Sequence, residues 1–111
     1  MDNEKRKIVI KDNDSKTLLE METQNGGIKI QAETKLEIKV GDNIVLKMNG
    51  NTGGVTLECN KLTVNTSGST DIEATGSLTA KGATVNVEAT SMLKVTSSGA
   101  TMVGGSPIKI G

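Results

Sequence analysis

An acidic run near the N-terminus begins like a calcium-binding loop. The stretch Asp12-Asn13-Asp14-Ser15-Lys16-Thr17 places oxygen-bearing side chains at its first positions. A calcium loop also needs an oxygen ligand at its fifth position, a glycine at its sixth and a later glutamate. Here Lys16 takes the third ligand position, Thr17 stands where the glycine is required, and no later glutamate completes the pattern. We therefore predict a solvated turn rather than a metal site.

Paired glycines occur three times, and each pair precedes apolar residues that are spaced by two. The pairs are Gly26-Gly27, Gly53-Gly54 and Gly104-Gly105. A phosphate-binding loop would need a following Lys-Ser/Thr and a helix, and neither is present. The pairs instead predict sharp turns after which the chain enters a strand again.

The sequence does not group residues in a way that would support acid–base or thiol catalysis. There is no histidine, and the carboxylates that alternate with apolar residues are spread along the chain at Glu33, Glu37, Glu58, Glu73 and Glu88. Cys59, the single cysteine, shares parity with Val55 and Leu57, so we expect it to pack as a small hydrophobe. It cannot form an intrachain disulfide. The prediction is a protein that is not an enzyme, with no catalytic residues, metal or cofactor.

Composition limits the possible classes further. The 111 residues include no Phe, Tyr or Trp, 34% are hydrophobic, and 13 basic residues balance 13 acidic ones. Without a basic patch or aromatic platforms, nucleic-acid binding is not expected. Twenty of the 26 charged residues lie in residues 1–61 and six in 62–111. No apolar signal core or membrane-length apolar run is present, so we expect synthesis in the cytoplasm without a signal peptide. Small β-branched side chains without rings suit a narrow, repetitive interior.

Apolar residues alternate in short bursts that recur every eight residues, which is typical of strands with one buried face. This order also argues against a disordered chain. One clear series is Ile28, Leu36 and Ile44, and a parallel one is Ile30, Ile38 and Leu46. The register slips at 51–54 and resumes at Val55. Later residues continue the step of eight as Val64, Ile72 and Ala80, as Val87, Val95 and Val103, as Val85 and Leu93, and as Met102 and Ile110.

A unit of eight residues holds one strand of about five residues and a tight turn. Single-chain solenoids usually have repeats of roughly 20 residues or more. A single-chain antiparallel meander is a second option, but its apolar face would need a covering layer. We therefore predict an all-β, intertwined homotrimeric β-helix, a triangular β-prism in which three chains each supply one strand per layer.

The repeats, with Gly-Gly turns such as Gly53-Gly54-Val55-Thr56-Leu57-Glu58, resemble the C-terminal β-helix, or needle, of contractile-injection spike proteins. These are the VgrG proteins of type VI secretion and the baseplate spikes of contractile phages. The segment 7–15 is similar to the stretch that leads into the family's helix, and 102–111 is similar to its blunt tip. The OB-fold and hub domains of the family are absent from this sequence.

The resemblance implies a structural spike that perforates a target envelope mechanically. It implies N-terminal strands and a turn leading into the helix (1–25), a β-helical shaft (26–103) and a C-terminal tip (104–111). The expected partners are two further copies of the chain, a PAAR-repeat cap on the tip, baseplate or tube components through missing N-terminal domains, and transiently the target membrane. The expected location is a virion tail or secretion apparatus, delivered outside the cell or into a target envelope. Iron-binding tips of the family use His-x-His ligands, which this chain lacks.

Two sets of site residues follow from this interpretation. The cap-binding tip is Ser106, Pro107, Ile108, Lys109, Ile110 and Gly111. The axial core that would join three chains is Ile28, Ile30, Leu36, Ile38, Val40, Ile44, Leu46, Met48, Val55, Leu57, Cys59, Leu62, Val64, Ile72, Val85, Val87, Leu93, Val95 and Val103.

Two alternatives keep the β-rich architecture but change the function. An ice- or surface-binding solenoid would present threonines in a flat array, and the threonines here are irregularly spaced. A glycan-binding adhesin or trimeric fibre would normally use aromatic side chains, which the chain lacks.

Overall fold

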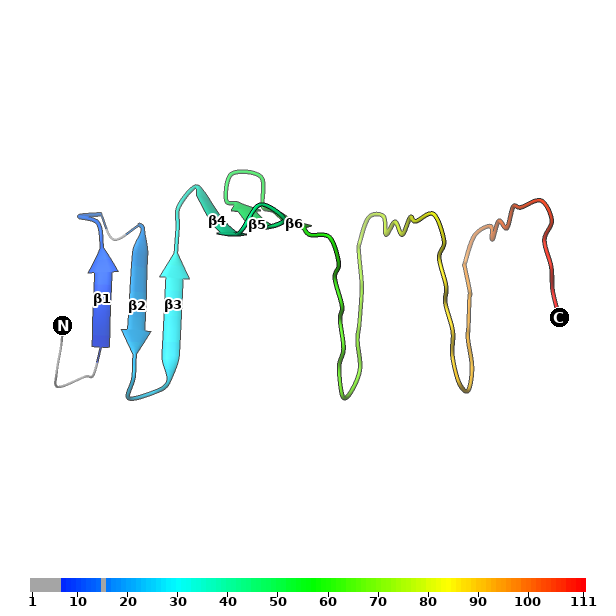
Figure 1. Cartoon of the computed structure of the whole chain (residues 1–111), viewed down its shortest axis with the longest axis horizontal. Helices are drawn as coiled ribbons and strands as arrows, with labels where there is room; N and C mark the ends of the chain where they lie inside the picture. The colour runs from blue at the N-terminus through cyan, green and yellow to red at the C-terminus, as the bar shows by residue number, and fades with distance from the viewer. Residues whose placement is uncertain (1–6, 15) are drawn as a thin grey trace. The chain divides into compact units, whose positions relative to one another are not determined.

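A computed structural model describes residues 7–14 and 16–111. Residues 1–6 of the predicted N-terminal segment, and Ser15 of the calcium-like run, lie outside the described part. The chain is all-β, as predicted, and no helix occurs among the described residues. The strands of the described residues are β1 (Lys7–Lys11), β2 (Leu18–Glu22), β3 (Gly27–Gln31), β4 (Lys35–Val40), β5 (Ile44–Asn49) and β6 (Gly54–Glu58) (Figure 1).

The first sheet is an antiparallel meander of β1, β2 and β3 in sequence order. Ile10 lies opposite Leu19, which in turn lies opposite Ile30. Residues directly opposite each other in adjacent strands project from the same face of a sheet. The alternation in the sequence therefore becomes one apolar face across all three strands, and it consists of Ile8, Ile10, Leu19, Met21, Ile28 and Ile30.

The second sheet repeats this arrangement with β4, β5 and β6. Leu46 lies between Ile38 and Leu57, and Met48 lies between Leu36 and Val55. No strand of this sheet pairs with β3, so the meander is interrupted at residues 32–34. A backbone hydrogen bond of 2.8 Å from Gly50 N to Thr34 O ties this link to the end of β5.

The hairpins explain why residues 7–58 form a meander and not the three-chain winding that we expected for every eight-residue unit. The turns after β2, β4 and β5 contain Gly26, Gly41 and Gly53, whose φ angles are +70°, +58° and +73°. Glycine adopts this left-handed region readily, and it lets the chain reverse within a few residues. Each strand therefore pairs with its own neighbour in the chain.

The chain divides into two compact units, 1–68 and 69–111. The backbone of the second unit forms no paired strands. Extended segments are separated by bends at 75–76, 83–84, 90–91, 98–99 and 106–107, which follow an earlier bend at 67–68. The steps between bends are therefore eight, eight, seven, eight and eight residues. The eight-residue repeat predicted from the sequence is present in the structure as a regular change of chain direction.

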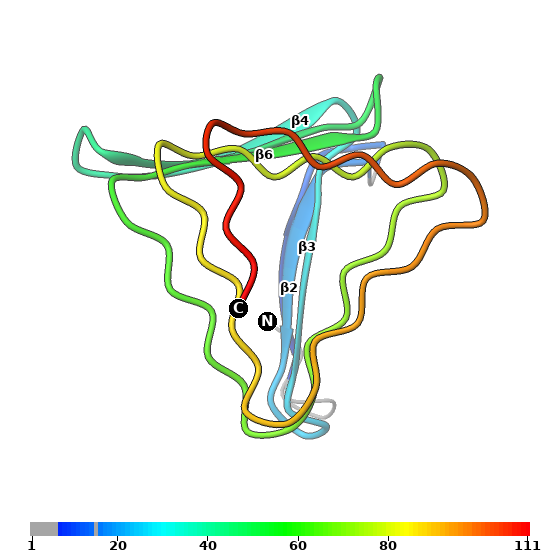
Figure 2. The same ribbon diagram turned by 90° about the vertical axis from the view of Figure 1, so that its right-hand side faces the viewer.

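Successive segments of the second unit run in three directions, and the fourth takes up the first direction again (Figure 2). Equivalent bends, such as those at 75–76 and 98–99, are 23 residues apart. No glycine between 54 and 110 has a positive φ, so the chain bends at each corner without reversing. Residues 69–111 thus form a coil with three segments per turn.

Candidate assembly interface

The two sheets leave their apolar faces uncovered. Ile28 and Ile30 are 70% and 55% exposed in the first sheet, and Val55 is 69% exposed in the second. No hydrophobic side chain among the described residues is buried. Each sheet therefore has an apolar face but no second layer, and a sheet normally needs that layer for stability.

The opposite faces of the sheets carry charged residues in complementary positions. In the first sheet Lys7 forms an ion pair with Glu20 at 2.5 Å, between β1 and β2. In the second sheet Glu37 lies directly opposite Lys47. Because one face is apolar and the other is charged, the apolar face is the one expected to pack against a further layer.

Total accessible surface gives a measure of how much of the chain is left uncovered. The chain exposes 10791 Å². A compact monomer of the same mass would expose about 5,800 Å². Burial of the excess requires contacts that the single chain does not make.

The bends of residues 62–111 define a common register for its apolar residues. Positions are counted back from the first residue of each bend. The fifth position holds Leu62, Thr70, Leu78, Val85, Leu93 or Thr101. The third position holds Val64, Ile72, Ala80, Val87, Val95 or Val103. The intervening fourth position holds Thr63, Asp71, Thr79, Asn86, Lys94 or Met102. Alternate residues of an extended segment point to opposite sides, so one side of every segment is apolar or carries Thr.

Backbone groups in this region are also without strand partners. None of residues 59–111, all of which the structure describes, pairs as a strand with another segment of the chain. All of these residues except Cys59, which is half-buried, are exposed in the single chain, so their extended segments present edges on which other strands could pair. The 23-residue coil has the length of a solenoid turn, but its successive turns do not form the ladder that stabilises a single-chain solenoid.

The predicted axial-core residues lie on the apolar faces of the two sheets and on the apolar side of the later segments. Ile28 and Ile30 lie on the apolar face of the first sheet, and those from Leu36 to Leu57 lie on that of the second. Cys59 is a half-buried free thiol one residue beyond β6, on the same parity as Leu57. Core residues from Leu62 onward occupy the fifth or third position before a bend. That these side chains meet on a common axis stays a prediction.

Five residues of the same surfaces were missed by the sequence reasoning. Ile8, Ile10, Leu19 and Met21 complete the first apolar face, although the predicted shaft began only at residue 26. Their alternation by two was visible in the sequence, but a six-residue turn separates the two strands and breaks the step of eight. Leu78 was missed because the next apolar residue in its series, Val85, comes after seven residues.

The predicted tip, residues 106–111, forms no strand with the rest of the chain. It begins with the bend at 106–107, where the Ser106–Pro107 peptide bond is cis. Ile108 is 51% exposed and Ile110 is 93% exposed. The tip is thus an extended segment with accessible backbone and apolar side chains, and cap binding there stays a prediction.

The calcium-like run is the turn between β1 and β2. Asp12 N donates to Thr17 O at 3.2 Å, and Asp12 Oδ1 accepts from Lys16 N at 3.2 Å. The first carboxylate therefore stabilises the turn, as expected of a solvated loop. In the described part of the chain, no group of three His, Cys, Asp or Glu residues could hold a metal ion, and no helix could span a membrane.

A shallow hollow joins the two apolar faces where the sheets are linked. Its apolar lining comes from Ile10, Leu18, Leu19, Ile30, Ala32 and Leu36. Lys16 Nζ lies 3.5 Å from Glu33 Oε1 near this link, and Gln31 Nε2 donates to Lys16 O at 3.3 Å. The hollow extends the same uncovered surface, and its lining also includes the polar residues Lys11, Asp12, Thr17, Gln31 and Lys35.

The fold and these surfaces define a class: an all-β chain with repeated, uncovered apolar faces. No family model, curated protein or solved structure matches the chain.

Proposed function

We propose that this protein is a trimeric needle, a structural element of a contractile injection apparatus. The observation that carries the proposal is the 23-residue coil of residues 69–111, whose three segments per turn do not pair with the segments of the next turn. Strands from other chains could pair with the edges of such a coil.

Strand spacing sets the dimensions of a three-chain assembly. Paired strands lie about 4.8 Å apart, so two intervening strands would separate successive turns of one chain by about 14 Å. Three chains related by a threefold axis would then fill each wall completely. Their ladders would pair the backbone of residues 59–111, and the apolar side of every segment would face the axis.

The first half of the chain fits the same threefold assembly. Three copies of each three-stranded sheet can form the three walls of a prism with their apolar faces inward. The charged faces, including Lys7, Glu20, Glu37 and Lys47, would then point to solvent. This packing supplies the covering layer that a single chain lacks.

The mechanical role rests on this architecture together with the resemblance to contractile-injection spikes. Continuous ladders and an axial core give stiffness, because local opening would require three chains to separate. Residues 95–108 carry no charge, which suits the leading end of a rod that crosses an envelope transiently. The final strand edges of residues 108–111 from three chains would be open, and a PAAR-type cap could extend them with its own backbone.

Binding of a PAAR-repeat protein tests the proposed role directly. The full chain and a chain ending at residue 103 are immobilised and compared for binding, with the oligomeric mass of both measured first. We expect the full chain to bind and the shortened trimer not to bind. Equal binding by both, or no binding to any PAAR protein by a correctly assembled full chain, would contradict the cap-presenting needle.

A further inference from the structure

Three charged residues of the second unit occupy the same position relative to the bends. Glu73, Lys81 and Glu88 are each the second residue before a bend, at 75–76, 83–84 and 90–91. They alternate in sign, and they are half of the six charged residues in 62–111. Their neighbours in this series, Asn65 and Thr96, are uncharged.

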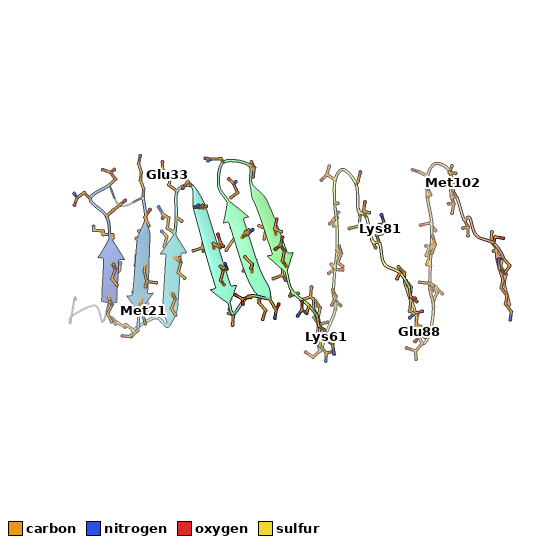
Figure 3. The ribbon with its side chains drawn as sticks, turned by 45° about the horizontal axis from the view of Figure 1, so that its top comes forward. Met21, Glu33, Lys61, Lys81, Glu88 and Met102 are labelled. Carbon is orange, nitrogen blue, oxygen red and sulfur yellow. The ribbon has the colours of Figure 1, made fainter. Side chains whose placement is uncertain are left out.

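These charges are separated from one another within a single chain. Figure 3 shows Lys81 and Glu88 on successive segments of the coil, and Figure 2 shows that successive segments run in different directions. Neither residue, nor Glu73, has an ion-pair partner among the described residues. The second position before a bend also has opposite parity to the apolar fifth and third positions, so these side chains point away from the apolar side.

Threefold winding fixes which segments become neighbours. If one chain places a segment on a given wall, its next segment lies on the next wall, one strand spacing further along the axis. A chain related by 120° brings its own copy of that next segment back onto the first wall. Neighbouring strands in a wall are therefore consecutive segments of different chains, arranged in parallel and aligned at their bends.

We propose that Glu73 of one chain, Lys81 of a second and Glu88 of a third form an ion-pair ladder on the outside of each wall. This inference rests on the proposed trimer and adds the stagger between its chains, which is one segment of about eight residues. A stagger of two segments would instead place Glu73 beside Glu88, and like charges in adjacent strands are destabilising. The ladder therefore stabilises the alignment of consecutive segments that threefold winding imposes.

Paired cysteines test the stagger without depending on stability. In a background with Cys59→Ala, the double variant Glu73→Cys/Lys81→Cys places one new thiol of each chain beside one of its neighbour, within disulfide range. Mild oxidation should convert the protein into a covalent trimer on a denaturing, non-reducing gel. The single variants should stay monomeric on that gel, because copies of one residue lie on different walls.

The double variant Glu73→Cys/Thr96→Cys is the matched control. Residues 73 and 96 are 23 residues apart in the same series, so they share a wall at a separation of about 14 Å, which is too far for a disulfide. It should not cross-link. A trimeric mass with no cross-link in Glu73→Cys/Lys81→Cys, or with a link in Glu73→Cys/Glu88→Cys instead, would overturn the stagger. A monomeric mass before oxidation would overturn the proposed trimer itself.

Charge variants test the contribution of the ladder. Lys81→Glu would place three carboxylates in a row and should lower the melting temperature of the trimer by several degrees. The combined swap Glu73→Lys/Lys81→Glu/Glu88→Lys restores the alternation and should recover most of that loss. If the swap is as unstable as the single variant, or if Lys81→Glu has no effect, the ion-pair ladder is wrong.

Discussion

Leu46 lies directly opposite Ile38, eight residues earlier in the chain, and both side chains project from the same face of the second sheet. Leu57 lies on the other side of Leu46. The eight-residue spacing of this pair comes from a hairpin, because the turn at Gly41 brings β5 back along β4. Since no layer covers the face, the row Ile38–Leu46–Leu57 is a direct test of whether a second copy packs against it.

Replacing Leu46 by serine should prevent or strongly weaken assembly. The change removes a large apolar side chain and adds a hydroxyl at a predicted axial position, at a cost of about 2–5 kcal/mol for each chain. Lys47→Ser is the matched control on the opposite face and should change the melting temperature by only a few degrees. Thermal unfolding followed by circular dichroism checks both variants. Equal effects of the two would contradict the assignment of the faces.

Replacing Val87 by aspartate should also strongly impair assembly, although Val87 is 65% exposed in the single chain. In the proposed trimer three carboxylates would be brought together near the axis, without charge partners. Asn86→Asp, one residue away and on the other side of the segment, should assemble normally. Size-exclusion chromatography with light scattering provides the readout, and a normal trimer for Val87→Asp would show that the inward register is incorrect.

Gly50→Ala should destabilise the first unit through a contact within one chain. A Cβ at residue 50 would lie 2.6 Å from Glu33 O, a backbone atom. Relief of that overlap must shift the link between the sheets and strain the hydrogen bond from Gly50 N to Thr34 O. We expect a loss of about 1–3 kcal/mol in the free energy of unfolding.

Gly68→Ala is the control for this variant, because a Cβ there meets nothing within 4 Å and its φ is not positive. Chemical denaturation of both variants measures the difference. A Gly50→Ala protein as stable as Gly68→Ala would contradict the described packing of the link.

Unfolding of the assembled protein should be slow, because three interlocked chains must separate before the core is exposed. Samples kept in SDS without boiling should therefore run as a trimer band, and boiled samples should run as the 11.6 kDa chain. Immediate dissociation in unheated SDS would argue against intertwined chains.

The β-class and the alternation of faces could be predicted from the sequence because both depend on local spacing. Ile28-Lys29-Ile30 has the period of a strand in any β architecture, and the register confirms that its two isoleucines share a face. The carboxylates of the calcium-like run could likewise be assigned to a turn, because the pattern lacked the residues that a metal site requires.

The path of the chain could not be predicted from the same spacing. A step of eight fits a hairpin as well as a bend between walls, and the two differ in the backbone angles at the corner. Gly41 has a positive φ and reverses the chain, whereas Gly76, at an equivalent bend of the second unit, has no positive φ. The interruption at 51–54 falls on the turn after β5 and the first residue of β6, and Asn49 Oδ1 accepts there from Asn51 N at 2.9 Å and from Thr52 N at 3.3 Å.

The mass of the purified full chain in solution tests the central claim most directly. Native mass spectrometry or light scattering should give about three times the chain mass of 11.6 kDa at every accessible concentration. A stable, folded monomer would contradict the account, because its apolar faces and the backbone of residues 59–111 would then have to be stabilised without partner chains.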